Sequence, residues 1–387
     1  MGLSNKTNVS KRDIKKGRYL WATPGAEILP DPLPETPGKI YDGAAIASFI
    51  TAAGYPCTLV NTSTGASVAG YHFNLANVLQ VNKVKAVIPA LEASLNCDAI
   101  LGKSGTAHFS ITLPRLERQT VHLKTAMCTT TFNDVEGAPA CLGTDAQGNT
   151  LALDISSLPH MIVSGSTGSG KSVLINSIIT SILFRRTPST HRFILIDPKE
   201  VEFTQFSGIP HLYHPIITDT RDAVSILGQL CAIMDQRYQQ LRQIGARDVD
   251  GTNLPRIIIV IDELADLILT SKKSVEESII RIAQKGRAAG IHLIISTQQP
   301  RAAVLTGLIR ANIPCKVALK TATATDSRIS LGYNGAEKLL GRGDALLVHP
   351  STPGEFKRFQ SAYISPWDIQ SVVGYWQSNQ AKRPLNR

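Results

Sequence analysis

The stretch Gly165-Ser-Thr-Gly-Ser-Gly-Lys-Ser172 decides the fold of this chain. An apolar run at 161–163 precedes it and predicts a buried strand, and residues 173–179 follow it with the pattern of a helix. A strand, a glycine-rich loop and a helix in this order are the context that a phosphate-binding loop requires. The sequence therefore predicts a nucleoside triphosphate site in an α/β domain.

The residue types in this loop suit the binding of phosphate. Glycines let backbone N–H groups turn toward phosphate oxygens, and the positive end of the following helix favours the same negative charge. We expect the lysine to reach the β- and γ-phosphates of the nucleotide and the last serine hydroxyl to bind Mg²⁺. The expected nucleotide-binding residues are Gly165, Ser166, Thr167, Gly168, Ser169, Gly170, Lys171 and Ser172.

The composition is that of an ordinary globular protein. Hydrophobic residues make up 43% of the 387 positions and charged residues 18%, which leaves room for about two or three domains with cores. The net charge of +10 favours a polyanionic partner, although a basic surface also serves solubility. The six cysteines lack C-x-x-C or His/Cys spacing and predict reduced thiols. No apolar run approaches the ~20 residues of a membrane span, and we expect a cytoplasmic protein.

Changes in residue pattern predict four segments. Residues 1–40 are basic and then proline-rich, and we expect a flexible arm. Residues 41–128 mix helix and strand patterns without a catalytic constellation, which predicts a small α+β domain. Residues 129–380 alternate between strands and helices, which predicts a P-loop ATPase domain with a parallel sheet. Residues 381–387 form a basic tail.

Inside the small domain, 120–123 alternates like a strand, and the polar stretch 128–145 predicts a hinge into the larger domain. His72, His108 and His122 lie in separate strand-like segments. We interpret these histidines as ordinary strand residues rather than as metal ligands.

A second chemical signal follows the strand predicted at 257–261. Its five consecutive β-branched residues indicate burial on both faces, and Asp262 and Glu263 stand at its carboxyl end. Ligands of open α/β sheets bind at the carboxyl ends of the strands. We expect Asp262 to hold Mg²⁺ through its water shell and Glu263 to act as the general base on the attacking water.

Two further patterns follow along the chain. Ser274-Val-Glu-Glu277 has the form of a capping box and predicts a helix that runs from there to about Ala289. The next strand, 291–295, ends in polar residues, and a side chain at this tip would lie near the γ-phosphate. Gln298 is therefore a candidate sensor, and a hydrogen bond at a strand end without any ligand role explains it as well.

An ordered series of motifs over about residues 40 to 380 resembles the motor domain of the FtsK/SpoIIIE family of DNA translocases. The motifs include Ile196-Asp-Pro-Lys199, Val260-Ile-Asp-Glu-Leu-Ala-Asp-Leu267, Gly286-Arg-Ala-Ala-Gly-Ile-His-Leu293 and Gly335-Ala-Glu-Lys-Leu-Leu-Gly-Arg-Gly-Asp344. Upstream, 109–123 resembles the end of the family's small α domain. The resemblance implies a RecA-like fold, ATP and Mg²⁺ as cofactors, and a homohexameric ring with double-stranded DNA in its pore.

The resemblance also implies that ATP lies between subunits, so that a neighbour supplies an arginine. The candidates, which the sequence does not rank and which also fit structural ion pairs, are Arg287, Arg310 and Arg328. Basic side chains should meet DNA phosphates without reading bases. The candidates, for which a solvated helix end is an equally good explanation, are Lys272, Lys273 and Lys285.

The sequence departs from the family in places. Thr297-Gln-Gln-Pro300 stands where members commonly read Thr-Gln-Arg-Pro, so any role of that arginine is vacant. The family's N-terminal membrane anchor and C-terminal winged-helix domain have no counterpart here, and we expect a motor without them. The leading hypothesis is an ATP-driven double-stranded DNA translocase that moves chromosome, plasmid or phage DNA. The alternatives are a conjugative-transfer or DNA-packaging ATPase, a protein-secretion ATPase, and a nucleotide-binding scaffold without turnover.

Overall fold

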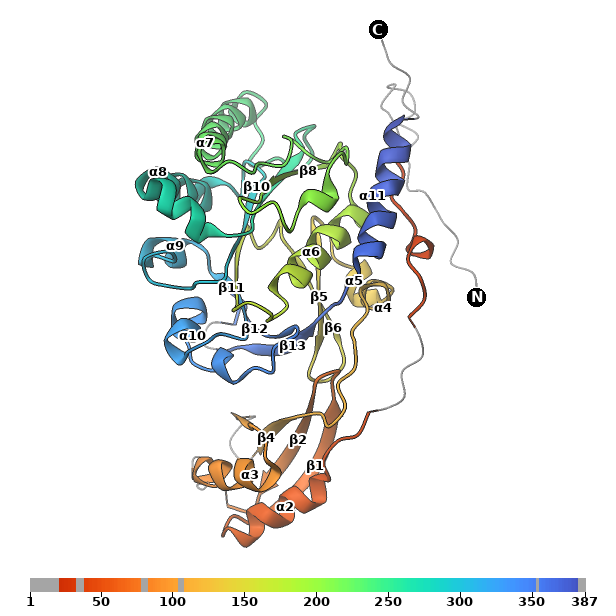
Figure 1. Cartoon of the computed structure of the whole chain (residues 1–387), viewed down its shortest axis with the longest axis vertical. Coiled ribbons are helices and arrows are strands. Elements are labelled where there is room, and N and C mark those ends of the chain that lie inside the picture. Colours follow the sequence, from red (N-terminus) through yellow and green to blue (C-terminus); the bar gives the residue numbers. More distant parts are fainter. Residues whose placement is uncertain (1–20, 33–37, 78–82, 104–107, 353–354, 382–387) are drawn as a thin grey trace.

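The computed structural model describes residues 21–32, 38–77, 83–103, 108–352 and 355–381. Figure 1 shows a small lobe at one end of the molecule and a larger lobe that carries the wide sheet. Residues 1–20 and 33–37 of the expected arm and residues 382–387 of the expected tail lie outside the described residues.

The small lobe is a four-stranded antiparallel sheet in the order β1-β2-β4-β3, on which two helices pack. Its elements are α2 (Gly43–Ala52), β1 (Cys57–Thr64), β2 (Val68–Leu75), α3 (Ile88–Leu95), β3 (Ile100–Lys103) and β4 (His108–Pro114). Alternate residues of β2 face the helices, and Phe73 stacks on Phe109 with ring centroids 5.2 Å apart. The lobe therefore has an apolar core of its own.

The larger lobe is built on a nine-stranded sheet in the order β6-β5-β13-β12-β11-β7-β10-β9-β8. The strands are β5 (Pro139–Asp145), β6 (Thr150–Asp154), β7 (His160–Ser164), β8 (His191–Ile196), β9 (Arg256–Ile261), β10 (Ile291–Thr297), β11 (Cys315–Leu319), β12 (Asp344–Val348) and β13 (Lys357–Ser361). The run from β11 to β8 is parallel, whereas β12, β13, β5 and β6 pair antiparallel. The α/β class is confirmed, but the sheet is mixed rather than parallel.

Helices cover both faces of this sheet. They are α4 (Leu123–Met127), α5 (Thr130–Asn133), α6 (Lys171–Arg185), α7 (Thr220–Gln243), α8 (Leu264–Lys285), α9 (Gly307–Asn312), α10 (Ala324–Leu331) and α11 (Pro366–Ala381). Met161 and Val163 of β7 pack on the α6 and α11 side, and Ile162 packs on the α7 and α8 side. This alternation explains why the central strand reads as one continuous apolar run.

Two expectations about local structure are wrong, and a third has the wrong bounds. Residues 120–123 form only an isolated bridge from His122 to Tyr363, and α4 begins at Leu123. The predicted hinge at 128–145 instead contains α5 and β5, because its middle is apolar and fully buried around Cys141. The helix predicted from Ser274 to about Ala289 has different bounds, since α8 is interrupted at the non-helical Ser271, so that its second part begins at Lys272 and ends at Lys285.

Part of the arm that we expected to be flexible lies against the larger lobe. Trp21 packs on Trp376 of α11 with ring centroids 5.8 Å apart, and the Tyr375 hydroxyl donates a hydrogen bond to the Ala22 carbonyl. Leu29 is 3% exposed, and the Leu29 carbonyl accepts a hydrogen bond from Lys124. Prolines favour an extended backbone, but they do not prevent that backbone from packing against the larger lobe.

None of the helices in the described ranges is long and apolar enough to cross a membrane.

Candidate nucleotide site

The phosphate-binding loop connects β7, at the centre of the sheet, to α6. Gly168 and Gly170 have φ values of 76° and 100°, a left-handed backbone that favours glycine. A Cβ on Gly170 would lie 2.6 Å from the backbone nitrogen of Gly343, so a larger residue would clash there. The same nitrogen donates a hydrogen bond to the Ser169 carbonyl at 2.7 Å, which fixes the loop against the turn before β12.

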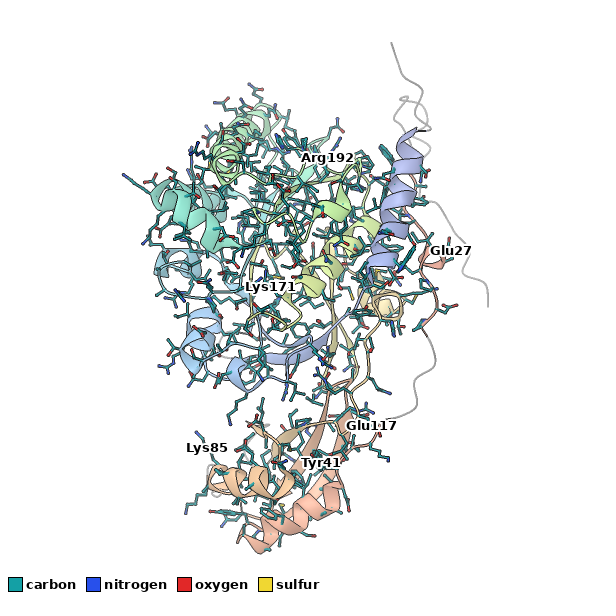
Figure 2. The ribbon with its side chains drawn as sticks, viewed as in Figure 1. Glu27, Tyr41, Lys85, Glu117, Lys171 and Arg192 are labelled. Carbon is teal, nitrogen blue, oxygen red and sulfur yellow. The ribbon has the colours of Figure 1, made fainter. Side chains whose placement is uncertain are left out.

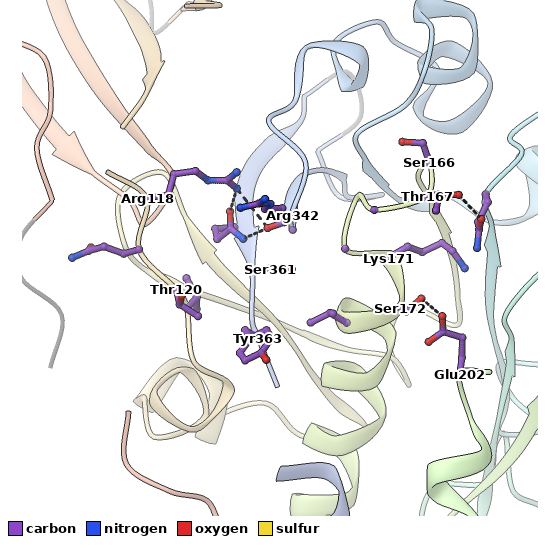
Figure 3. A pocket seen from close by; sticks show the side chains of 18 residues that line it. Arg118, Thr120, Ser166, Thr167, Lys171, Ser172, Glu202, Arg342, Ser361 and Tyr363 are labelled. Atoms are coloured by element: carbon purple, nitrogen blue, oxygen red, sulfur yellow. Dashed lines mark hydrogen bonds between the residues drawn. The ribbon is translucent and has the colours of Figure 1, made fainter. Parts of the chain in front are cut away.

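A cavity of about 690 Å³ lies beside this loop, a volume within the range of small-molecule sites. Figure 3 shows side chains converging on it from the loop, from the segment after β4 and from the end of β13. The cavity wall includes Arg118, Thr167, Lys171, Ser172, Glu202, Gln298 and Arg342. The expected nucleotide-binding loop therefore borders an open site.

Lys171 contacts the ends of two neighbouring strands. Its ammonium donates hydrogen bonds to Oδ1 of Asp262 at 2.9 Å, to the Asp262 carbonyl at 3.0 Å and to Oγ of Ser296 at 2.9 Å. Figure 2 labels Lys171 well inside the larger lobe. The structure thus brings together the lysine and the aspartate that the sequence singled out separately.

Glu263 is held on the same strand ends, 2% exposed. Its Oε1 accepts hydrogen bonds from the Thr297 hydroxyl at 2.6 Å and from the Ala265 N–H at 3.2 Å, and its Oε2 accepts one from the Gln298 N–H at 2.9 Å. These donors fix the position of the carboxylate. Glu263 is buried and is not among the residues of the cavity wall in this conformation.

Gln298 lies over the phosphate-binding loop. Its Oε1 accepts a hydrogen bond from the Thr167 hydroxyl at 2.9 Å, and its side chain borders the cavity. Its role toward the terminal phosphate stays a prediction. The bond itself ties β10 to the loop, so Gln298 also has a structural role in this conformation.

Glu202 is a site residue that the sequence analysis missed. The Ser172 hydroxyl donates a hydrogen bond to its Oε1 at 2.6 Å (Figure 3). Glu202 follows the Asp197-Pro-Lys199 motif by a few residues, and this closeness is the sequence signal that could have identified it as a site residue. Oδ2 of the fully buried Asp197 accepts hydrogen bonds from the Glu202 N–H at 2.8 Å and the Phe203 N–H at 2.9 Å, which fixes the loop.

Two arginines of the cavity wall were also missed, although both lie in family-like stretches, Arg118 in 109–123 and Arg342 in 335–344. Arg118 donates hydrogen bonds to the Gly341 carbonyl at 2.9 Å and to Oε1 of Gln360 at 3.0 Å. Burial lowers the pKa of Arg118, an effect that the nearby Asp344 carboxylate opposes. Arg342 is exposed and has a φ of 50°, which is unusual for a residue with a side chain. The wall opposite Glu202 is therefore basic.

Comparison with known proteins identifies the family. A model of the FtsK/SpoIIIE family matches residues 123–254 and 250–302. The DNA translocase FtsK of Corynebacterium efficiens is 36% identical over 390 residues, which cover 93% of this chain and 41% of that protein. The chain is a homologue of the FtsK/SpoIIIE-family DNA translocases. The resemblance inferred from the motifs is confirmed, and family membership makes this chain a P-loop NTPase with an ATP-binding site.

A second relative extends the comparison. The DNA translocase SftA of Bacillus subtilis is 37% identical over 335 residues, 83% of this chain and 35% of that protein. The chain spans less than half the length of these curated relatives. Among solved structures, the pCW3 conjugation coupling protein TcpA with ATPγS superposes with a TM-score of 0.57 at 22% identity, over 85% of this chain and 97% of that one. This likeness supports the fold.

The three arginines that we expected to serve a neighbouring subunit, Arg287, Arg310 and Arg328, lie outside the cavity wall. Arg287 and Arg328 are exposed, and Arg310 is half-buried. Arg328 donates a hydrogen bond from Nε to Oδ1 of Asn334 at 2.9 Å. None of the three serves this chain's own site in the described conformation, and the geometry does not rank them.

The three candidate DNA-binding lysines do not form one cluster. Lys272 and Lys273 are exposed just after the non-helical Ser271, whereas Lys285 is the last residue of α8. At a rise of about 1.5 Å per residue, the two positions are about 20 Å apart along the helix. The Lys285 carbonyl accepts a hydrogen bond from the Tyr238 hydroxyl, which links this end of α8 to α7.

Proposed function

We propose that this chain is an ATP-driven motor that moves double-stranded DNA and works as a homohexameric ring in the cytoplasm, with Mg²⁺ as cofactor. The observation that carries the proposal is the cavity beside the phosphate-binding loop, in a chain homologous to DNA translocases. The net charge of +10 agrees with a polyanionic track.

The residues at the loop fit a magnesium ion. The Ser172 hydroxyl and the carboxylates of Asp262 and Glu202 are oxygen donors, the ligands that Mg²⁺ prefers. No group of three His, Cys, Asp or Glu side chains within the described segments forms a metal site alone. This agrees with an ion that arrives with the nucleotide, and such an ion would neutralise developing phosphate charge.

The chain's own residues would then act as follows. Backbone N–H groups of the loop bind phosphate oxygens, and Lys171 moves its ammonium from Asp262 to the β- and γ-phosphates. Glu263 takes a proton from the attacking water once a conformational change opens the strand ends to solvent. Gln298, which lies over the loop, orients the water or the terminal phosphate.

The ring is supported by the position of the candidate arginines. Arg287, Arg310 and Arg328 lie outside the wall of this chain's own cavity, and Arg287 and Arg328 are exposed, as an arginine that serves the site of a neighbouring subunit would be. An arginine from the next subunit would couple hydrolysis at one site to the arrangement of the ring. Lys272 and Lys273 are proposed to contact the DNA backbone, and Lys285 is a weaker candidate because of its distance from them.

The deciding experiment measures ATP hydrolysis with and without linear duplex DNA, with Lys171→Ala as the inactive control. We expect duplex DNA to stimulate hydrolysis and added salt to reduce the stimulation steeply. Hydrolysis that is indifferent to DNA would overturn the proposal in favour of a protein-transport ATPase. Electron microscopy of the protein with ATPγS and DNA tests the ring separately.

A further inference from the structure

The proton of the Ser172 hydroxyl has a defined acceptor in this structure. A serine hydroxyl has one proton to donate and two lone pairs that accept. When such an oxygen binds a cation through a lone pair, its proton must point to another group. Here that group is Oε1 of Glu202, 2.6 Å from the Ser172 oxygen.

Glu202 reaches this place from a neighbouring strand end, in a loop that is held firmly. Asp197 at the end of β8 is fully buried and binds the Glu202 backbone, and Gln205 donates a side-chain hydrogen bond to the Glu202 carbonyl at 2.9 Å. β8 lies beside β9, and the Asp262 N–H donates a hydrogen bond to the Ile196 carbonyl at 3.0 Å. The two carboxylates therefore approach the phosphate-binding loop from adjacent strands.

The carboxylate expected at the metal is otherwise engaged. Asp262 binds the ammonium of Lys171 and is 2% exposed, and it is not among the residues of the cavity wall. Glu202, in contrast, borders the cavity and contacts the hydroxyl directly. Glu202, which contacts Ser172, thus belongs neither to the phosphate-binding loop nor to the acidic pair after β9.

We propose that Glu202 is a positioning residue of the magnesium site. It accepts the proton of Ser172, turns the lone pairs of that oxygen toward the cation, and places a negative charge beside it. The same charge repels nucleotide phosphates when no cation is present, so Glu202 makes nucleotide binding depend on magnesium. This inference rests on the proposed magnesium-dependent ATP chemistry.

The test measures binding rather than turnover. A fluorescent N-methylanthraniloyl-ADP is bound to the full chain in EDTA, and Mg²⁺ is then titrated in. Loss of a group that supports a metal ligand typically costs about 10- to 100-fold in metal affinity. We expect Glu202→Ala to raise the Mg²⁺ concentration that gives a half-maximal change in nucleotide binding by at least about 10-fold. We also expect Glu202→Gln, which removes only the charge, to bind the nucleotide more tightly than wild type in EDTA.

A matched control comes from the same loop. Glu200 is exposed and lies outside the cavity wall. Glu200→Gln makes the same chemical change as Glu202→Gln. It should behave as wild type in both measurements. Because Glu202 is proposed to orient Ser172, the increase in Mg²⁺ requirement of the double variant Ser172→Ala/Glu202→Gln should be smaller than the sum of the increases of the two single variants. Equal thermal melting in EDTA shows that each variant is folded.

The outcomes separate the inference from the proposed function. If nucleotide binding by the wild-type chain does not respond to Mg²⁺, the magnesium part of the proposed function is wrong. If nucleotide binding by wild type responds to Mg²⁺, and both Glu202 variants need the same Mg²⁺ concentration as wild type, the positioning role is overturned. Additive losses in the double variant would also overturn it, because Glu202 would then act independently of Ser172.

Discussion

The ammonium of Lys171 lies 2.9 Å from Oδ1 of Asp262, and both side chains are only 3% exposed. In the proposed function the lysine binds phosphate and the aspartate holds the cation, whereas in this conformation the two groups neutralise each other. Ser296 adds a hydrogen bond to the same ammonium at 2.9 Å. Nucleotide binding must therefore compete with a buried ion pair.

The first prediction concerns stability without nucleotide. Lys171→Ala leaves the Asp262 carboxylate buried without its cation, a loss that typically costs about 3–5 kcal/mol. We expect the free energy of unfolding in urea to fall by about this amount, in addition to the loss of nucleotide binding. The double variant Lys171→Ala/Asp262→Asn should recover part of the stability while nucleotide binding stays lost. A single variant as stable as wild type would show that the ion pair contributes nothing.

The second prediction separates hydrolysis from binding at Glu263. Glu263→Gln should lower the rate of ATP hydrolysis by about 10²- to 10⁴-fold, because the general base is lost. Its affinity for ATP should be unchanged, since Glu263 lies outside the cavity wall. Single-turnover kinetics together with equilibrium ATP binding measure the two effects.

Thr297→Val supplies the matched variant for this site. It removes the hydroxyl that binds Oε1 of Glu263 at 2.6 Å but keeps the size of the side chain. We expect a smaller loss of hydrolysis than in Glu263→Gln, with ATP binding again unchanged. Full activity of Glu263→Gln would exclude Glu263 as the base.

The third prediction concerns the DNA-binding surface. If Lys272 and Lys273 each neutralise one phosphate, replacing either with Ala should lower the magnitude of the slope of log affinity against log salt by about 1. Basal ATP hydrolysis should stay the same, because both lysines lie outside the cavity wall. Fluorescence anisotropy of a labelled duplex at several salt concentrations measures the slope.

Lys357 on β13 is exposed and serves as the control for charge removal on another face. Lys357→Ala should leave the salt slope unchanged. If Lys272→Ala and Lys273→Ala also keep the salt slope of wild type, the DNA binds elsewhere on the molecule.

The fourth prediction concerns pH. Burial lowers the pKa of His211 to about 3, so the ring stays neutral in the folded chain. In the unfolded chain the pKa is about 6.5, and the unfolded state takes up the proton below that value. His211 therefore contributes stability that is present above about pH 6.5 and is lost as the pH falls toward 3, by up to about 1.4 kcal/mol per pH unit.

Urea unfolding between about pH 8 and pH 5 measures this effect. His211→Gln should flatten the acid side of the profile by about one proton. His211 also contacts Trp376 edge to face, with ring centroids 4.4 Å apart, so the variant should be less stable at every pH. An unchanged acid slope in His211→Gln would show that other groups dominate. Burial also lowers the pKa of His160 and His292 to about 3. Both histidines are still present in His211→Gln and still contribute to the acid slope.

Much of the nucleotide site was predictable because its signals are local. The spacing of glycines, lysine and serine in 165–172 reports backbone geometry within one turn. The acids at 262 and 263 could be placed at a strand end because five β-branched residues precede them. Local patterns failed where tertiary context decided, as at 120–123, whose strand-like alternation forms only an isolated bridge from His122 to Tyr363.

Only the tertiary structure decided which distant residues meet. Ser172 and Glu202 are separated by 30 positions and Lys171 and Asp262 by 91, so no spacing rule connects them. Their contact depends on the strand order, which places β8, β9, β10 and β7 side by side with their carboxyl ends at one edge. The sequence by itself determined the class of the protein and the phosphate-binding loop. The order of the strands determined which carboxylate receives the serine proton, because long-range pairing is fixed by packing of the whole sheet and not by neighbours along the chain.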